Sequence, residues 1–302
     1  MPTPPLPDPS HTSLAPATGD WLSARATAWQ LSRDRLELGP IPLVMGILNV
    51  TPDSFSDGGR FYTVQNAIDR ALEMEDAGAA ILDIGGESTR PYSQGIDDDE
   101  ELRRVVPVLE KLQGRLSAPV SIDTTKASVA RAAMGLGAQI INDVSGLEAD
   151  PEMLSVAVTT SAGVCAMHRQ GTPQTMQDNP TYDHCVLEIL EYLRRRDREL
   201  IEHGISAERI CLDPGVGFGK THEHNLELVR SASVFHYLRR PILIGHSRKG
   251  FIAKLLGSKD IDRTFGTVGV SLALASHRVQ ILRVHDVAAH VQALNLFHAS
   301  GG

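Results

Sequence analysis

Three polar residues that could recognise a flat heterocycle each follow a short apolar run of the sequence: Asp123, Asn142 and Asp213. An ionised carboxylate only accepts hydrogen bonds, whereas a carboxamide both donates and accepts them. The set therefore suits a ring that presents adjacent N–H donors, such as the aminopyrimidinone edge of a pterin or of guanine. Asp123, which precedes Thr124, could alternatively be only the N-cap of the next helix, because aspartate is a common cap.

Cationic side chains follow other apolar runs or lie within them: Arg90, Arg248, Lys249 and Arg283. Arginine binds phosphate through two parallel hydrogen bonds and lysine acts as a point charge, so these residues can form a diphosphate pocket. The polar residues that could complete the pocket are Asn49, Thr89 and His285. Arg283 lies inside the apolar run 281–284, and a buried arginine needs a partner. We interpret Arg283 as a ligand-binding residue; the alternative is an internal salt bridge.

The glycine-rich segment 213–221 resembles two nucleotide-binding motifs without meeting either. A P-loop requires glycine five positions before Gly219, where this chain has Pro214. A dinucleotide-binding fingerprint requires a third glycine where this chain has Lys220. We therefore expect the glycines to let the backbone approach a ligand closely.

The elements that must position these residues follow a regular rhythm of short apolar runs and longer amphipathic segments, which is typical of βα units around a parallel sheet. Eight runs are predicted to be strands: Leu43–Leu48, Ala80–Ile84, Pro119–Ile122, Gln139–Ile141, Gly163–Met167, Ile210–Leu212, Pro241–Ile244 and Ile281–Val284. Helices are predicted between them, among others at Val64–Ala77, Asp98–Gln113, Lys126–Leu136, Tyr182–His203 and Val268–His277.

Eight βα units in a chain of 302 residues favour a closed (β/α)8 TIM barrel over an open doubly wound sheet. Polar residues follow all eight predicted strands, including His168 after the fifth. Since the carboxyl ends of parallel strands meet at one mouth, we expect the site there. The long segments 51–63 and 88–96 after the first two strands are candidate lids over that mouth.

Residues 1–20 are rich in Pro, Ser and Thr and are predicted to be a disordered extension before one domain, 21–302. The segment Trp29–Leu38 is predicted to form a short hairpin. The chain shows no signal-peptide pattern and no apolar run long enough to span a membrane. The net charge of -8 argues against a nucleic-acid partner. Three cysteines without a CxxC pattern indicate buried thiols in a reducing cytoplasm: Cys165, Cys185 and Cys211.

Three further patterns receive a structural interpretation. His222 and His224 have a spacing found in metal sites, but they lie at a predicted helix start, which we favour over a metal site. The run Arg194–Arg196 is predicted to be a solvated, salt-bridged helix face. The apolar segment Val268–Ala275 could belong to the core, to a dimer surface, or to both.

Taken in order, the motifs after the strands resemble those of the dihydropteroate synthase family of folate biosynthesis, from Leu43 to Val287. The matching segments are Met45–Gly59, Asp83–Pro91, Ser121–Thr124, Ile141–Gly146, Met167–His168, Asp213–Lys220, Ser247–Phe251 and Arg283–Val287. Ordered motifs at all eight strand ends make the resemblance specific.

The resemblance implies a transferase that joins 6-hydroxymethyl-7,8-dihydropterin diphosphate to 4-aminobenzoate with Mg²⁺ and works as a homodimer. It implies a pterin site formed by Asp123, Asn142, Met167, Asp213, Phe218 and Lys249. It implies a diphosphate site formed by Asn49, Thr89, Arg90, Arg283 and His285, with Asn49 near the metal. An aminobenzoate site, where sulfonamides would compete, is implied at Phe55, Pro91 and Ser247. The catalytic role falls to Lys249, Arg283, Asp123 and Arg90.

Two departures from the family pattern concern loops: Tyr92 stands where the family usually has glycine, and Arg169 stands where it often has an apolar residue. Two rival functions share the pterin contacts. A methyltransferase that acts on methyltetrahydrofolate and a corrinoid protein would not need an arginine-rich diphosphate pocket, which the segments 88–90 and 247–249 indicate. A catalytically silent pterin-binding paralogue would lack key site residues, and this sequence has them.

Overall fold

The computed structural model describes residues 22–51, 64–89, 92–258 and 260–302, and in this part of the chain eight strands run parallel in one sheet. The strands are β3 (Leu43–Asn49), β4 (Ile81–Gly85), β5 (Val120–Asp123), β6 (Ile140–Asp143), β7 (Gly163–Met167), β8 (Ile210–Asp213), β9 (Leu243–Ile244) and β10 (Ile281–Val284). Each strand pairs with the next along the chain, except that a bridge between Leu212 and Ile242 joins β8 to β9. Because β10 also pairs with β3, the sheet closes into the predicted (β/α)8 TIM barrel.

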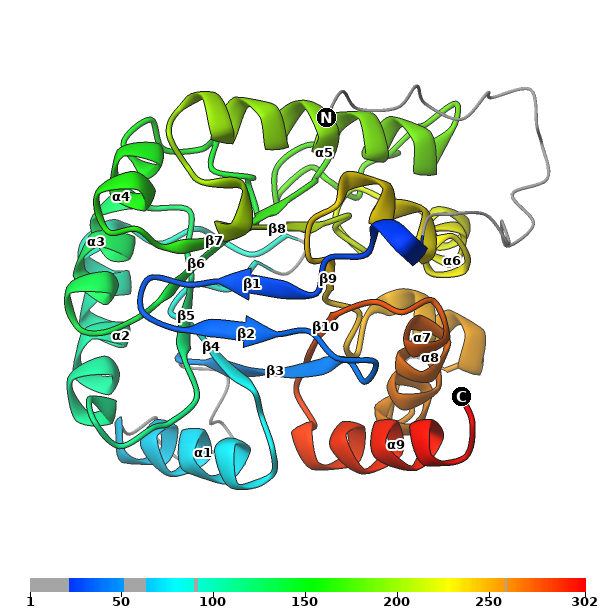
Figure 1. Cartoon of the computed structure of the whole chain (residues 1–302), viewed down its shortest axis with the longest axis horizontal. Coiled ribbons are helices and arrows are strands. Elements are labelled where there is room, and N and C mark those ends of the chain that lie inside the picture. The colour runs from blue at the N-terminus through cyan, green and yellow to red at the C-terminus, as the bar shows by residue number, and fades with distance from the viewer. Residues whose placement is uncertain (1–21, 52–63, 90–91, 259) are drawn as a thin grey trace.

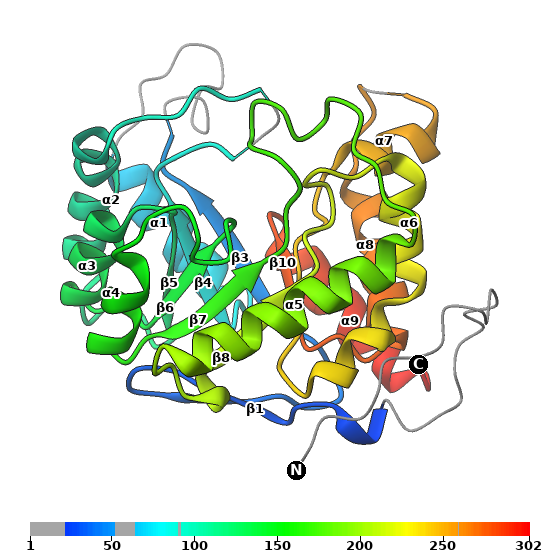
Figure 2. The ribbon, with the colours of Figure 1, turned by 90° about the horizontal axis from the view of Figure 1, so that it is seen from above.

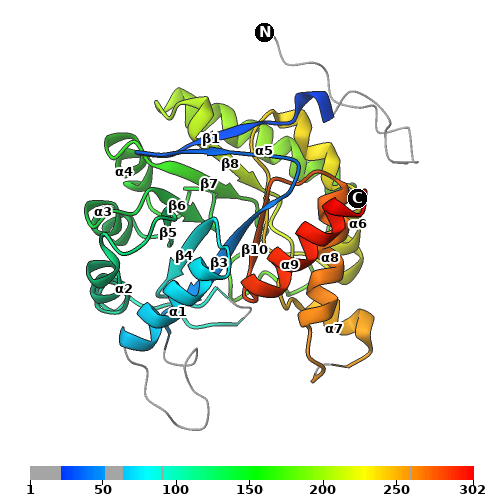
Figure 3. The same cartoon turned by 60° about the horizontal axis from the view of Figure 1, so that its bottom comes forward.

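Helices surround the strands on the outside (Figure 1) and form a ring when the molecule is tilted (Figure 3). They are α1 (Val64–Asp76), α2 (Asp98–Leu112), α3 (Ala127–Gly135), α4 (Met153–Thr159), α5 (Cys185–Glu202), α6 (His222–Arg230), α7 (Gly250–Leu256), α8 (Thr264–Ser276) and α9 (Val287–Ala299). Short 3₁₀ turns complete the set at Leu22–Ala24, Ala207–Arg209 and Ala232–Leu238. No described helix has the length and apolar character needed to cross a membrane.

The interior of the barrel is layered because successive side chains of a strand point to opposite faces. One layer is apolar and completely buried, with a residue from every strand except β5: Met45, Ile81, Ile140, Cys165, Cys211, Leu243 and Ile281. Two positions further along four of the same strands, the inward residues are polar: Asp83, Asn142, Asp213 and Arg283. The barrel therefore changes from an apolar core to a polar floor over one inward-facing step.

The predicted hairpin closes the amino-terminal end of the barrel. Its strands, β1 (Ala28–Gln30) and β2 (Arg35–Glu37), pair antiparallel, and Figure 2 shows β1 at the end opposite the loops that follow the barrel strands. Trp29 is completely buried against the apolar layer, and its indole Nε1 donates to the carbonyl of Arg209 at 2.9 Å. The predicted extension at 1–20 lies outside the described residues.

Some predicted boundaries need correction. Strand β9 is shorter than predicted because Pro241 has no N–H and the amide of Ile242 donates to the Gln280 side chain at 3.1 Å instead of to a strand. Helix α5 begins at Cys185, three residues later than predicted. Helix α8 begins at Thr264, four residues earlier than predicted, through residues of weak intrinsic helix propensity.

The prediction of a solvated arginine face is wrong for one of its three members. The Arg195 side chain is 56% exposed, but that of Arg196 is only 7% exposed. The guanidinium of Arg196 donates to the carbonyls of Gly146 at 2.6 Å and Leu147 at 3.0 Å. Arg196 therefore binds the loop after β6 to helix α5, an arrangement that the spacing of charges along one helix does not reveal.

Replacing Trp29 with alanine is expected to destabilise the barrel without changing the site. Removal of a fully buried aromatic ring should lower the free energy of unfolding by roughly 3–5 kcal/mol. Urea denaturation would measure the change. Leu22, which is 51% exposed and lies in the same amino-terminal region, is the matched control. Leu22→Ala should change the free energy of unfolding by less than about 0.5 kcal/mol. Equal effects of the two variants would show that the hairpin does not support the barrel.

Candidate active site

A cavity of about 860 Å³ lies at the carboxyl ends of the barrel strands. Its lining includes the predicted site residues that the structure describes: Asn49, Thr89, Asp123, Asn142, Met167, Asp213, Phe218, Ser247, Lys249, Arg283 and His285. Three other predicted site residues, Phe55, Arg90 and Pro91, lie outside the described residues. The expectation that polar strand ends meet at one mouth is thus confirmed.

The three predicted heterocycle-binding residues come from β5, β6 and β8 and are nearly inaccessible: Asp123 is 6% exposed, Asn142 4% and Asp213 5%. Asp123 does not cap helix α3, because the N-cap there is Lys126, so the capping alternative is wrong. Instead, Asp123 Oδ2 accepts a hydrogen bond from Arg283 Nη2 at 2.5 Å. Asp213 Oδ1 accepts from the backbone N–H of Gly215 at 2.7 Å.

Arg283 lies between two carboxylates of the barrel interior. Its Nε donates to Asp83 Oδ2 at 2.5 Å, and its Nη2 donates to Asp123. The internal salt bridge that the sequence left as an alternative is therefore present, and the guanidinium lines the cavity as well. Burial raises the pKa of Asp123 to about 7; Arg283 opposes this shift, while the Asp83 carboxylate adds to it.

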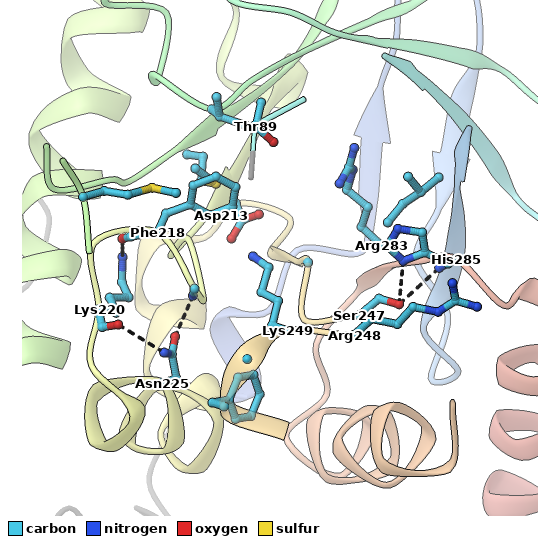
Figure 4. Close-up of a pocket in the computed structure, with 18 of the residues that line it drawn as sticks. Thr89, Asp213, Phe218, Lys220, Asn225, Ser247, Arg248, Lys249, Arg283 and His285 are labelled. Atoms are coloured by element: carbon cyan, nitrogen blue, oxygen red, sulfur yellow. Dashed lines mark hydrogen bonds between the residues drawn. The ribbon is translucent and has the colours of Figure 1, made fainter. Parts of the chain in front are cut away.

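Lys249 is the central cation of the cavity, and Figure 4 shows it pointing toward Asp213. Its ammonium donates to the carbonyl of Val216 and lies 4.2 Å from the centre of the Phe218 ring. Burial lowers the pKa of Lys249 to about 7, against the opposing effect of the Asp213 carboxylate. Gly217, with φ of 84°, leaves room for this side chain, because a Cβ would lie 2.5 Å from Lys249 Cδ.

Lys220 is a cavity residue to which the sequence analysis gave no role. It is 2% exposed, and its Nζ lies 3.0 Å from His168 Nδ1 and 2.9 Å from the carbonyl of Phe218. Burial lowers the pKa of His168 to about 2, so His168 is neutral and can accept this hydrogen bond. The loop that carries Phe218 is thus held from beneath, and Tyr182 adds a bond to the carbonyl of Gly219 at 2.9 Å.

Asp83 is a second residue whose role near the site was not predicted, although its place in the sequence indicated one. It lies inside an apolar strand, as Arg283 does, so the argument that a buried charge needs a partner applied to both. Asp83 is completely buried and is not among the residues that line the cavity.

The opposite wall of the cavity is formed by residues that follow β3, β4, β9 and β10. His285 Nδ1 lies 2.9 Å from Ser247 Oγ, a contact drawn in Figure 4, and Asn49 and Thr89 line the cavity too. Arg248, predicted as a further cation of the pocket, pairs with Asp286 at 2.7 Å, and its side chain is 48% exposed. Arg248 nevertheless lines the cavity, as predicted, so the predicted cations found there among the described residues are Arg248, Lys249 and Arg283.

The two histidines with metal-like spacing begin helix α6, as favoured from the sequence. Thr221 is the N-cap, its side chain accepts from the N–H of His224 at 3.2 Å, and His224 Nδ1 accepts from the N–H of Thr221 at 3.3 Å. Among the described residues, no group of three or more His, Cys, Asp or Glu side chains could hold a metal ion. Asn49, whose carboxamide oxygen is of a type that can bind a metal ion, lines the cavity.

Comparison with known proteins shows which family has this barrel and these strand ends. A family model described as pterin binding enzyme matches residues 45–285. The dihydropteroate synthase of Haemophilus influenzae is 42% identical over 260 residues, which cover 86% of this chain and 94% of the relative. The chain belongs to the dihydropteroate synthase family of pterin-binding enzymes.

Solved structures of the family agree in fold. The Yersinia pestis dihydropteroate synthase in complex with a sulfonamide drug has a TM-score of 0.85 at 41% identity, covering 90% of this chain and 98% of that chain. The Xanthomonas albilineans dihydropteroate synthase in complex with 7,8-dihydropteroate has a TM-score of 0.81 at 39% identity, with coverage of 90% and 98%.

The departure from the family pattern at Tyr92 has a visible structural consequence. Tyr92 has a φ of 62°, in the left-handed region where glycine is favoured. Its N–H donates to the carbonyl of Pro173 at 3.0 Å, and its hydroxyl donates to Asp178 Oδ1 at 3.1 Å. The segment after β4 is thereby attached to the segment after β7, across the mouth of the barrel.

The raised pKa of Asp123 predicts how ligand binding depends on pH. Below a pKa of about 7 the carboxyl becomes protonated and loses acceptor capacity, so the affinity for 6-hydroxymethyl-7,8-dihydropterin should fall as the pH is lowered. One group titrating near pH 7 weakens binding roughly eightfold between pH 7.5 and pH 6. Isothermal calorimetry measures this with a ligand that carries no phosphate. Asp123→Asn should bind weakly at both values; an unchanged pH dependence in that variant would assign the titration to another group.

Proposed function

We infer that the chain joins 6-hydroxymethyl-7,8-dihydropterin diphosphate to 4-aminobenzoate, giving 7,8-dihydropteroate and diphosphate in folate biosynthesis. It is therefore a transferase. The observation that carries this conclusion is the polarity of the cavity: buried hydrogen-bond acceptors meet Lys249 and Arg283 within one space. A pterin diphosphate has the same two-sided character, with N–H donors on its ring and negative charge at its other end.

For the pterin ring we propose a slot between the strand ends. Asp123, Asn142 and Asp213 accept from its 2-amino group and ring N–H groups. Lys249 donates to the ring, and its packing against Phe218 keeps the ammonium in place. Met167, which is 3% exposed and lies beside Asp213 in the strand register, supplies apolar contact.

For the diphosphate we propose binding by Arg283, His285, Asn49 and Thr89, with Arg90 joining from outside the described residues. Arg283 and Lys249 stabilise negative charge that increases as the leaving group departs, and such stabilisation accelerates the reaction because it is stronger in the transition state. Ser247 orients His285 through its hydroxyl contact.

The donor set fits Mg²⁺ held jointly by protein and substrate. Mg²⁺ keeps several waters and is usually bound by one or two carboxylates together with substrate phosphates, and carbonyl oxygens also suit it as ligands. Asn49 provides a side-chain oxygen in the cavity, and the diphosphate would provide the others. When bound, the ion would neutralise charge on the departing diphosphate.

In the reaction, the bond from the pterin methylene to the diphosphate oxygen breaks, and the diphosphate leaves with the electron pair. A bond forms from the methylene carbon to the amine nitrogen of 4-aminobenzoate, which gives up a proton. The electron-rich dihydropterin supports the positive charge that develops on the methylene. The protein therefore needs to orient the two substrates and exclude water rather than provide a covalent nucleophile.

We propose that 4-aminobenzoate binds beside Ser247, where the mouth opens, with Phe55 and Pro91 completing its site. A sulfonamide, which resembles this acid in shape, would compete there.

The three buried free thiols, Cys165, Cys185 and Cys211, support a reducing, cytoplasmic location.

Amine-dependent release of diphosphate tests the reaction. The purified chain, the dihydropterin diphosphate and Mg²⁺ are incubated with and without 4-aminobenzoate, and diphosphate and dihydropteroate are measured. Both products should form only when the amine is present. Binding of the pterin without release would favour the corrinoid-linked methyltransferase or the silent paralogue.

Lys249→Ala should reduce turnover by at least about a hundredfold, because it removes the cation that joins the ring site to the diphosphate site. Circular dichroism and the melting temperature check that the fold is intact. Lys111, an exposed residue of helix α2 that does not line the cavity, is the matched control, and Lys111→Ala should keep most of the activity. Near-normal turnover in Lys249→Ala would overturn this assignment of the site.

We further propose that the chain forms a homodimer through helix α8. Phe265 is 85% exposed, and Gly269 and Ala273 are exposed at the following helical positions on the same face. Exposed Leu256 and Ile261 extend the apolar character next to α8. Exposed apolar patches of this kind are typical of protein contacts, and twofold homodimers are the commonest assembly.

Phe265→Glu should therefore shift the chain from dimer to monomer, because it places a charge in an apolar interface. Size-exclusion chromatography with light scattering measures the mass. Leu22→Glu is the control, because it places the same charge at a residue that is 51% exposed and far from α8 in the sequence. It should leave the mass unchanged. A wild-type mass equal to one chain would contradict the proposed dimer.

A further inference from the structure

Asp83 lies in the second interior layer of the barrel, beneath the cavity. It belongs to β4, opposite Ile47 of β3 and Ser121 of β5. The side chain is completely buried and does not line the cavity. Any effect of Asp83 on a ligand must therefore act through its neighbours.

One oxygen of Asp83 holds two residues that do line the cavity. Asp83 Oδ2 accepts from Arg283 Nε at 2.5 Å and from Asn142 Nδ2 at 3.1 Å. The other oxygen, Oδ1, has no hydrogen-bond partner among the described residues. Among the described residues, the Asp83 carboxylate is therefore linked to the cavity by its hydrogen bonds to the Arg283 guanidinium and the Asn142 carboxamide.

The contact with Asn142 decides which way its amide faces. An ionised carboxylate cannot donate a hydrogen bond, so the amide atom turned toward Asp83 must be the NH₂ group. Arg283, which stays charged, donates to the same carboxylate oxygen, so this oxygen faces the guanidinium as well as the amide. The carbonyl oxygen Oδ1 of Asn142 is then left for the cavity that this residue lines.

We propose that Asp83 is a positioning and specificity-determining residue: by orienting the amide of Asn142, it makes the site select a ring edge of hydrogen-bond donors. With Asn142 Oδ1 facing the ligand, the site presents acceptors from three strands, the other two being Asp123 and Asp213. In a ring that carries a carbonyl in place of the 2-amino group, the carbonyl oxygen would face an acceptor oxygen of the site, and no hydrogen bond could form between them. The inference rests on the proposed function, since it concerns the pterin site of that reaction.

The test compares two ligands, 6-hydroxymethyl-7,8-dihydropterin and its 2-oxo analogue, by isothermal calorimetry. Wild-type protein should prefer the 2-amino ligand by roughly 10- to 100-fold, because the 2-oxo ring leaves buried acceptors unpaired. In Asp83→Ala the amide of Asn142 can turn its NH₂ group to the cavity, and this preference should fall by about tenfold or more. The KM for the dihydropterin diphosphate should rise while that for 4-aminobenzoate stays the same.

The conservative variant separates orientation from general structural support. In Asp83→Asn the amide oxygen can accept from both Arg283 and Asn142, so the ligand preference should remain within about threefold of wild type. Asp83→Ala in an Asn142→Ala background should have little further effect on the preference, because the two residues act through one contact. Should the alanine variant be unstable, Asp83→Leu, which retains side-chain volume, repeats the measurement.

A matched control addresses the loss of a buried carboxylate as such. Asp197 is 9% exposed and pairs with Arg240 at 2.7 Å, on helix α5 outside the barrel. Asp197→Ala should lower stability and leave the ligand preference unchanged. If Asp83→Ala weakens both ligands equally, the role of Asp83 is structural and the proposal is wrong. If the wild type binds neither ligand, the proposed function itself fails.

Discussion

A guanidinium buried between two carboxylates is the interaction on which the site depends. Arg283 cannot be desolvated without partners, and Asp83 and Asp123 supply them from β4 and β5 at 2.5 Å each. Burial is the main reason that the pKa of Asp123 rises; the Arg283 guanidinium opposes the rise, and the Asp83 carboxylate that shares this cation adds to it. The next cation, Lys249, faces this acidic interior from the opposite wall. The pocket is thus prepared for a ligand that brings its own hydrogen-bond donors and its own negative charge at separate ends.

The barrel separates stability from function along its axis. At the amino-terminal end of the barrel, the apolar layer and the hairpin with Trp29 exclude water and stabilise the fold by burying apolar surface. Above, one inward-facing step along the strands, the same sheet presents charged and amide groups. The alternation of side chains across a strand makes this change abrupt, because no residue between the two layers faces the interior. Asp123, Asn142, Asp213 and Arg283 therefore line the cavity from rigid strand ends, which favours accurate positioning.

The loop after β8 shows how local backbone freedom and buried polar contacts combine. Gly217 makes room for Lys249, and Lys220 with neutral His168 supports the backbone of Phe218 from the other side. Lys249 lies over the Phe218 ring, whereas Lys220 holds the carbonyl of the same residue. Burial lowers the pKa of Lys220 and that of Lys249 to about 7.

The sequence by itself determined the fold class, the order of the strands and the polar residues at their ends, because periodicity and motif spacing are local properties that survive without coordinates. It also predicted which acceptors and cations gather at the cavity, and it indicated the family. The tertiary structure decided what each charge does. Arg196 is buried because it reaches carbonyls of a loop 50 residues away, Arg248 pairs with Asp286, and Asp83 orients Asn142 across two strands. Such partners are chosen by the closure and register of the sheet, which bring together residues far apart in the chain, and no spacing within one segment encodes them.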